Sequence, residues 1–380
     1  MKNYPLFLFL LSTITITTCN AQNNTKKTPN LKDTFKKDFY IGAAINQSQI
    51  EEKNPAENAL IVSQFSSITA ENIMKSMFTH PQKDKYDFGL TDKFVAFGQK
   101  NNMFIHGHTL IWHSQLAHWM TEIKDSTEMK NVMKEHITTI VSRYKGKIGS
   151  WDLVNEAVND DGTVRKSVFS NLLGENFLAY AFEFASKADP KADLYYNDYS
   201  MTNPAKRETV IRLVKGIQAK GIKIDGIGMQ GHWQLNSPTI DEIEKSILAY
   251  SSLGVKVAIT ELDVSALPSP WEMKGAEISQ RFENSPKMNP YPNGLPDSVQ
   301  VQLAKRYEDI FKLFLKHKDK ISRVTFWGIN DGQSWLNDFP IKGRTNYPLL
   351  FDRELKPKKA FYSVIETAQD KQSFKKKLKN

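Results

Sequence analysis

Short apolar runs alternate with longer amphipathic segments through most of the chain. The short runs are rich in β-branched and aromatic residues, which predicts strands, and they cover residues 39–43, 65–69, 104–107, 150–154, 193–196, 226–229, 256–260 and 323–327. Between the runs, apolar residues recur at three- and four-residue spacing. This period predicts helices over residues 92–101, 127–144, 177–188, 204–220, 240–253 and 298–316.

Alternation of strands with helices predicts a parallel sheet with the helices outside it. Eight such units in about 330 residues match a (β/α)8 TIM barrel. The rival arrangement is an open, doubly wound sheet, which usually carries a Gly-rich phosphate turn after its first strand. Residues 42–46 read Gly-Ala-Ala-Ile-Asn and lack that turn. We therefore expect one α/β domain, a (β/α)8 catalytic barrel over residues 37–368.

The first 21 residues are predicted to be an export signal. A lysine at position 2 is followed by an uncharged, mostly apolar run over residues 5–18, which is too short to span a bilayer comfortably. Two cleavage sites stay open. One is cleavage after Ala21, and the other is lipoprotein cleavage before Cys19, which would leave a lipid on that sulfur.

The segments that flank the barrel have biased compositions. Residues 22–36 are rich in Asn, Thr and Lys without periodicity, which predicts a linker. Residues 369–380 are predicted to be a Lys-rich C-terminal tail. The whole protein is expected to be exported, and to be secreted, periplasmic or lipid-anchored at the cell surface.

Composition narrows the possible partners without choosing one. The 380 residues include a single cysteine, which excludes a disulfide scaffold and a four-cysteine metal site. The formal charge of +9 permits an acidic partner. No nucleic-acid recognition motif is visible, and export also argues against nucleic-acid binding. We expect a monomer with no transmembrane segment, no cofactor and no metal site.

Polar and aromatic residues gather just after the predicted strands, where barrel enzymes build their sites. Residues of this kind follow the second, third, fourth, sixth, seventh and eighth strands: Glu71, Asn72, Lys75, His106, His108, Trp112, His113, Gln115, Asn155, Glu156, Gln230, His232, Glu261, Asp263, Trp327 and Trp335. His106, His108 and His113 are spaced weakly for a metal site, and histidines that only form hydrogen bonds are commoner. Six clusters at one end of a barrel point to a single site.

Glu156 and Glu261 carry the expected chemistry. They follow strands on opposite sides of the barrel and should face each other across its mouth. Glycoside cleavage needs two carboxyl groups, one to protonate the leaving oxygen and one to attack or to activate water. His232 can reach Glu261 and Asp263 and keep Glu261 ionised as a nucleophile. A negative Glu261 would raise the pKa of Glu156, as an acid requires.

Two further residue types favour a sugar substrate. Asn155 is placed to bind a sugar 2-hydroxyl, where hydrogen bonds strengthen at the transition state. The aromatic faces of Trp112, Trp327 and Trp335 suit the apolar faces of pyranose rings when they lie beside paired carboxylates.

The motifs resemble those of glycoside hydrolase family 10, the (β/α)8 endo-β-1,4-xylanases. The resemblance covers about residues 38–366, and the matching segments are 68–75, 107–115, 151–157, 195–199, 227–233, 259–263 and 326–328. It implies an endo-1,4-β-xylanase acting on xylan and xylo-oligosaccharides with retention of configuration, with Glu156 as acid/base and Glu261 as nucleophile.

The resemblance also implies residues that line the sugar subsites: Glu71, Asn72, Lys75, His108, Trp112, Gln115, Asn155, Gln230, His232, Trp327 and Trp335. Asn197 and Tyr199 look like lining on the leaving-group side. Residues 263–299, a Pro-rich loop, and 329–334 are less typical of the family. The alternatives are another retaining barrel glycosidase acting on β-glucan and a catalytically silent xylan-binding barrel.

Overall fold

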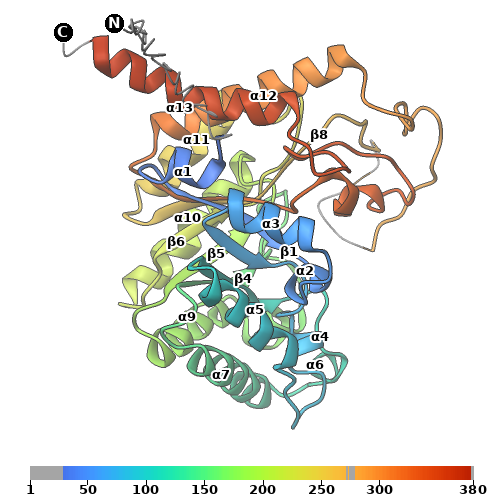
Figure 1. The fold of residues 1–380 in the computed structure, drawn as a ribbon. Helices are drawn as coiled ribbons and strands as arrows, with labels where there is room; N and C mark the ends of the chain where they lie inside the picture. The colour runs from blue at the N-terminus through green and yellow to red at the C-terminus, as the bar shows by residue number, and fades with distance from the viewer. Residues whose placement is uncertain (1–28, 271–272, 274–278, 378–380) are drawn as a thin grey trace, which may run out of the picture.

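Eight strands of the described chain run parallel and close into a barrel in the computed structural model, which describes residues 29–270, 273 and 279–377 (Figure 1). They are β1 (Tyr40–Ile45), β2 (Ser67–Ala70), β3 (Phe104–Trp112), β4 (Ser150–Asn155), β5 (Asp193–Asp198), β6 (Gly226–Met229), β8 (Lys256–Ser265) and β9 (Ile321–Phe326). Each strand pairs with the next of these along the chain, and β9 returns to β1. The predicted (β/α)8 barrel is confirmed.

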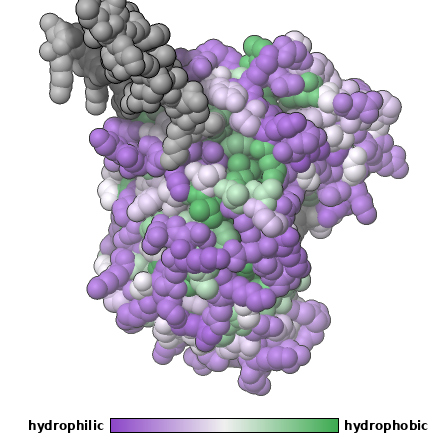
Figure 2. Space-filling view, viewed as in Figure 1, coloured by the Kyte–Doolittle hydropathy of each residue, from purple (hydrophilic) through white to green (hydrophobic). Residues whose placement is uncertain are grey.

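One long helix follows each barrel strand. These helices are α3 (Pro55–Gln64), α5 (Gly89–Lys100), α7 (Ser126–Arg143), α9 (Asn176–Ala188), α10 (Pro204–Ala219), α11 (Ile240–Ser251), α12 (Asp297–Lys316) and α13 (Lys359–Lys377). The six predicted helices are all present, with ends that move by at most three residues. Figure 2, in the view of Figure 1, shows a mostly hydrophilic surface over α5 and α7.

Short helices occupy the loops between these elements, where sequence periodicity is too brief to predict them. They are α2 (Gln47–Ile50), α4 (Ser76–Thr79), α6 (His118–Thr121), α8 (Val168–Leu173) and the 3-10 turns η1 (Asp331–Gln333) and η2 (Trp335–Asn337). Capping explains one of the long helices well. The side chain of Asn203 accepts from the backbone N–H of Ala205 at 3.0 Å, Pro204 opens α10, and Gly221 follows its end with φ +67°.

The N-terminal boundary of the packed domain differs from the prediction. Residues 22–36 were expected to be a linker, but α1 (Leu31–Phe35) lies within them. Its Leu31 and Phe35 are fully buried, and Phe35 stacks on Phe39 with ring centroids 5.4 Å apart. Two apolar side chains four residues apart are enough to dock one helical turn, although they are too few to show periodicity. The folded domain therefore includes residues before position 37.

The remaining boundary predictions lie at the ends of the chain. The expected signal over 1–21, with Cys19 and Ala21, lies outside the described residues. Helix α13 continues into the expected tail over 369–380 as far as Lys377. In the part of the chain that is described, no helix is both long and apolar enough to cross a membrane.

A ninth strand, β7 (His232–Gln234), was not predicted. It pairs in parallel with the distal part of β8, which continues beyond its predicted end at 260 to Ser265. The pairing sets His232 opposite Asp263. Three residues are too few to show a strand pattern in a sequence, yet this pairing positions a side chain of the site.

The space around two glycines predicts opposite effects of replacing them with alanine. A Cβ on Gly107 would lie 2.2 Å from the ring of Trp151, which is 1% exposed and has no room to move. A Cβ on Gly216, within α10, would meet nothing within 4 Å. Gly107→Ala should therefore cost about 1–3 kcal/mol of unfolding free energy by overpacking. Gly216→Ala should stabilise by about 0.5–1 kcal/mol through helix propensity.

Thermal and urea unfolding of the two variants beside the unchanged protein measure this difference. Equal transition midpoints for Gly107→Ala and Gly216→Ala would contradict the packing of Trp151 against the wall.

Candidate active site

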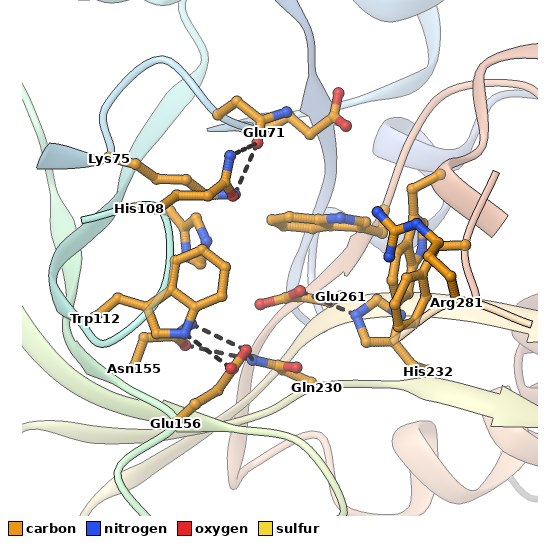
Figure 3. Close-up of a pocket in the computed structure, with 15 residues that line it drawn as sticks. Glu71, Lys75, His108, Trp112, Asn155, Glu156, Gln230, His232, Glu261 and Arg281 are labelled. Atoms are coloured by element: carbon orange, nitrogen blue, oxygen red, sulfur yellow. Dashed lines mark hydrogen bonds and ion pairs between the residues drawn. The ribbon is translucent and has the colours of Figure 1, made fainter. Parts of the chain in front are cut away.

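One pocket at the carboxyl ends of the strands brings together residues from across the chain. Its lining is Glu71, Asn72, Lys75, His108, Trp112, Gln115, Asn155, Glu156, Gln230, His232, Glu261, Arg281, Trp327, Trp335 and Phe339. Every predicted subsite residue except Asn197 and Tyr199 is among them. Figure 3 shows Glu156 and Glu261 on facing sides of this pocket.

Glu156 follows β4 directly and is held in an unusual backbone conformation. Its φ is +56°, a left-handed value that side-chain-bearing residues seldom adopt and that costs of order 1 kcal/mol or more. Its side chain is 6% exposed. One carboxyl oxygen accepts from the indole N–H of Trp112 at 2.8 Å, and the other from Gln230 at 3.0 Å and Asn155 at 3.2 Å. These contacts fix the direction of the carboxyl group.

The pKa of Glu156 is raised above the ordinary value for glutamate. Burial is the largest cause, and the negative charges of Asp198 and Glu261 add to it. Hydrogen bonds from Gln230 and Trp112 act in the opposite direction, because they stabilise the charged form. The net result favours a protonated Glu156, the form that an acid catalyst needs.

Glu261, on β8, lies in a different environment. One of its oxygens accepts from the side-chain amide of Asn197 at 2.9 Å, and the other lies 3.0 Å from Nε2 of His232. Asn197 is fully buried and also donates to Asn155 at 2.9 Å. The carboxylate therefore has two polar contacts of fixed direction, and one is with a group that carries positive charge.

His232 owes its position to the unpredicted strand β7. Its Nδ1 lies 3.0 Å from Asp263, while its Nε2 faces Glu261. Burial lowers the pKa of His232, but the two carboxylates outweigh that cost and raise it to about 10. The imidazolium therefore persists at neutral pH. Asp263 also accepts from the indole N–H of Trp335 at 2.8 Å, so one carboxylate orients two lining residues.

Lys75 holds the wall of the pocket that faces His232 in Figure 3. Its ammonium donates to Asn72 at 2.8 Å and Gln115 at 2.7 Å, and lies 4.7 Å from the ring centroid of Trp112. Burial lowers the pKa of Lys75 to about 8, although neighbouring carboxylates, Glu261 first, act against that shift. Burial also raises the pKa of Glu71, while Lys75 partly offsets it.

A layer of buried polar groups lies beneath the pocket. His108 places Nδ1 2.9 Å from Asp152, and Trp327 packs edge-on against the ring of His108. Asp152 also contacts His106, whose Nε2 is 3.0 Å away. Burial alone would raise the pKa of Asp152, but the two histidines reverse this and hold it well below its usual range. The anion fixes His108 in the pocket floor.

Asn197 and Tyr199 were expected to line the pocket on the leaving-group side, but neither is among its lining residues. Asn197 does not line the pocket; with no exposed surface, it supports Glu261 from beneath. Tyr199 lies in an adjoining cavity that shares Gln230, His232 and Trp335 with the pocket. The ring of Tyr199 has the buried ammonium of Lys206 3.6 Å from its centroid. Their positions at the end of a strand place both residues near the site. The sequence position alone does not show which of their side chains reaches the pocket surface.

Two lining residues, Arg281 and Phe339, were not predicted from the sequence. Both lie in long loops, far in the chain from the strand ends that guided the prediction. Only the four-residue spacing between Trp335 and Phe339, which stack 4.8 Å apart at 15°, carries a sequence signal.

His106, His108 and His113, whose spacing was a weak signal for a metal site, contact other side chains of the barrel. Among the described residues, no group of three or more His, Cys, Asp or Glu side chains is arranged to hold a metal ion. His106 contacts Ser150 and Asp152, His108 contacts Asp152, and His113 packs edge-on against Trp112.

Known proteins share both this sequence and this architecture. Endo-1,4-beta-xylanase A of Xylanibacter ruminicola is 45% identical over 351 residues, which cover 91% of this chain and 94% of that protein. A family 10 endoxylanase retrieved from a sugarcane soil metagenome has 48% identity and a TM-score of 0.86, covering 89% of this chain and 99% of its own. A mutant protein solved in complex with xylotriose has 36% identity and a TM-score of 0.80, covering 89% of this chain and all of its own, 100%.

The family model described as glycosyl hydrolase family 10 matches residues 30–367, which is nearly all of the described barrel. The resemblance seen in the motifs is thereby confirmed: this chain belongs to glycosyl hydrolase family 10.

Proposed function

We propose that the protein is an endo-1,4-β-xylanase that cleaves internal bonds of xylan and xylo-oligosaccharides with retention of configuration. The observation that carries the proposal is the pairing of Glu156 and Glu261 in one pocket, where the pKa of Glu156 is raised and Glu261 lies 3.0 Å from the imidazolium of His232. The xylanase names of the similar proteins support the choice of xylan over β-glucan.

In the first step, the carboxylate of Glu261 attacks the anomeric carbon and forms a glycosyl ester as the bond to the leaving oxygen breaks. Glu156 gives its proton to that oxygen. In the second step, Glu156 takes a proton from water, and the resulting nucleophile displaces Glu261 from the sugar. The raised pKa of Glu156 suits the first role. The loss of charge on Glu261 in the intermediate removes one cause of that raised pKa, so Glu156 can ionise and accept a proton in the second step.

Neighbouring residues hold this pair in position. His232 and Asn197 orient the oxygens of Glu261, and Asp263 orients His232. Asn155 donates to Glu156 and accepts from Asn197, which also donates to Glu261. We propose that it binds the sugar 2-hydroxyl, where hydrogen bonds strengthen at the transition state.

Nine other lining residues are proposed to bind sugar. Trp112, Trp327 and Trp335 offer aromatic faces to pyranose rings, and sugar hydroxyl groups find polar partners in Glu71, Asn72, Lys75, His108, Gln115 and Gln230. Tyr199 is proposed to contact the leaving-group side through its adjoining cavity. No step of this reaction requires a cofactor.

We also propose that the enzyme is exported and acts as a monomer outside the cytoplasm. The support is the apolar run over residues 5–18, with processing after Ala21 or a lipid anchor at Cys19. Mass spectrometry of the mature protein distinguishes the two, because only the second leaves a lipid on its first residue.

Removing the nucleophile tests the function directly. The unchanged protein should release reducing sugar from xylan and not from cellulose. Glu261→Ala should lower kcat on xylan by about 10³-fold or more, because no glycosyl ester can form. Glu175→Ala, which removes an exposed partner of Arg212, is the control and should keep full activity. Near-normal activity of Glu261→Ala, or equal activity of the unchanged protein on cellulose, would contradict the proposal.

Glu156→Ala should separate the two steps. Hydrolysis of xylan should fall by about 10²–10⁴-fold, because the leaving sugar oxygen needs a proton. A dinitrophenyl xylobioside has a leaving group that needs none, so a burst of dinitrophenol should remain. Azide should then restore turnover and give a glycosyl azide of retained configuration. The absence of both burst and rescue would remove Glu156 from the acid/base role.

The alkaline limb of the activity profile should report the ionisation of Glu156. Activity falls as pH rises through its raised pKa, because the acid loses its proton. Trp112→Phe removes a hydrogen bond that lowers this pKa, so the limb should move to higher pH by up to about one unit. Trp119→Phe is the matched control, since that indole donates to the backbone of His80 outside the pocket. A limb that moves to lower pH in Trp112→Phe would contradict the assignment.

A further inference from the structure

Arg281 is a cationic residue of the pocket that the proposed reaction does not use. It comes from the long loop between β8 and α12 and lines the pocket beside Phe339. Its side chain is exposed, unlike the buried ammonium of Lys75. In Figure 3 it lies on the wall opposite Lys75 and His108.

Contacts with the last loop hold the backbone around Arg281. The N–H of Phe282 donates to the carbonyl of Pro340 at 3.1 Å, and the side chain of Asn284 donates to the carbonyl of Gly343 at 3.2 Å. The N–H of Thr345 in turn donates to the side chain of Asn289 at 3.1 Å. The loop is therefore attached to the same segment that carries the aromatic wall.

Aromatic rings in contact with one another lead from Arg281 to the residues around Glu261. The guanidinium lies 5.7 Å from the ring centroid of Phe339, within cation–π range. Phe339 stacks on Trp335, and Trp335 lies 4.8 Å from His232, which contacts Glu261. Arg281 thus lies at one end of this aromatic row, and the other end of the row reaches Glu261.

The two cations of the pocket have different surroundings. Lys75 is buried and donates to Asn72 and Gln115 on its own wall. The Nη1–H of Arg281 donates to the backbone carbonyl of the preceding residue, Gln280, at 2.7 Å. A guanidinium carries five N–H donors in a planar fork that matches a carboxylate. A plain xylose polymer has no charge for such a group to neutralise.

We propose that Arg281 binds the carboxylate of a uronic acid branch on xylan, so that the enzyme prefers acid-decorated over neutral chains. The inference rests on the proposed xylanase function and names its substrate class more closely. The net charge of +9 attracts any polyanion to the protein, but only a cation within the pocket can convert that attraction into selection at the site of cleavage.

Three substrates and matched variants test this role. The substrates are a xylo-oligosaccharide with one glucuronic acid branch, the same compound with its carboxyl reduced to an alcohol, and the unbranched chain. At low salt the unchanged enzyme should favour the acid over its reduced form by about tenfold in kcat/KM. Arg281→Gln should abolish this preference and keep kcat/KM on the unbranched chain within about twofold. Arg281→Lys should keep part of it.

Lys287→Gln is the control, because it removes the same charge from an exposed position of the same loop that does not line the pocket. It should keep the full preference. The proposal is overturned if the unchanged enzyme shows no preference, if Arg281→Gln retains it, or if that variant loses activity equally on all three substrates.

Failure of the xylanase function itself would be visible separately, as inactivity of the unchanged protein on the unbranched chain. Calorimetric titration of the acid and reduced oligosaccharides, in the Glu261→Ala background with and without Arg281→Gln, decides the role of Arg281 without turnover. Tighter binding of the acid form that disappears with Arg281→Gln supports the proposal, and equal binding of both forms overturns it.

Discussion

Closure of the barrel between β6 and β8 is the constraint on which the site depends. All eight barrel strands of the described chain are parallel, so once the ring closes their carboxyl ends share one mouth. Glu156 and Glu261 lie far apart in the sequence, and neither has any local reason to meet the other. Ladder pairs lead from the strand before Glu156 to the strand that carries Glu261: Asn155 pairs with Asn197, Asn197 with Gly228, and Gly228 with Ala258.

The groups around the two glutamates differ, although the exposures of the two side chains are nearly equal at 6% and 5%. Glu156 has neutral donors around it and negative charges behind it, including Asp198, so its pKa rises. Glu261 faces an imidazolium that Asp263 helps to keep protonated. Two chemically identical side chains thereby have different electrostatic surroundings, which is the difference that the proposed acid and nucleophile roles require.

Different parts of the structure hold the two carboxyl groups and Arg281. Residues on β4, β5, β7 and β8 position Glu156 and Glu261 through hydrogen bonds between rigid elements. Arg281 and Phe339 lie in long loops that lean on one another and on Trp335. The proposed selection of acidic branches therefore depends on loops other than the elements that hold the two carboxyl groups.

The sequence alone was enough to predict the barrel and nearly all of the pocket. Repeated strand–helix alternation and polar clusters after the strands are local patterns, and the family motifs occupy consecutive residues. Other features depend on tertiary structure, because local sequence patterns carry no information about contacts between distant segments. Strand β7, the docking of Leu31 and Phe35, the burial of Asn197 and the entry of Arg281 and Phe339 all depend on contacts between segments distant in the chain. Such contacts leave no periodicity in either partner, because only the closed barrel brings the two together.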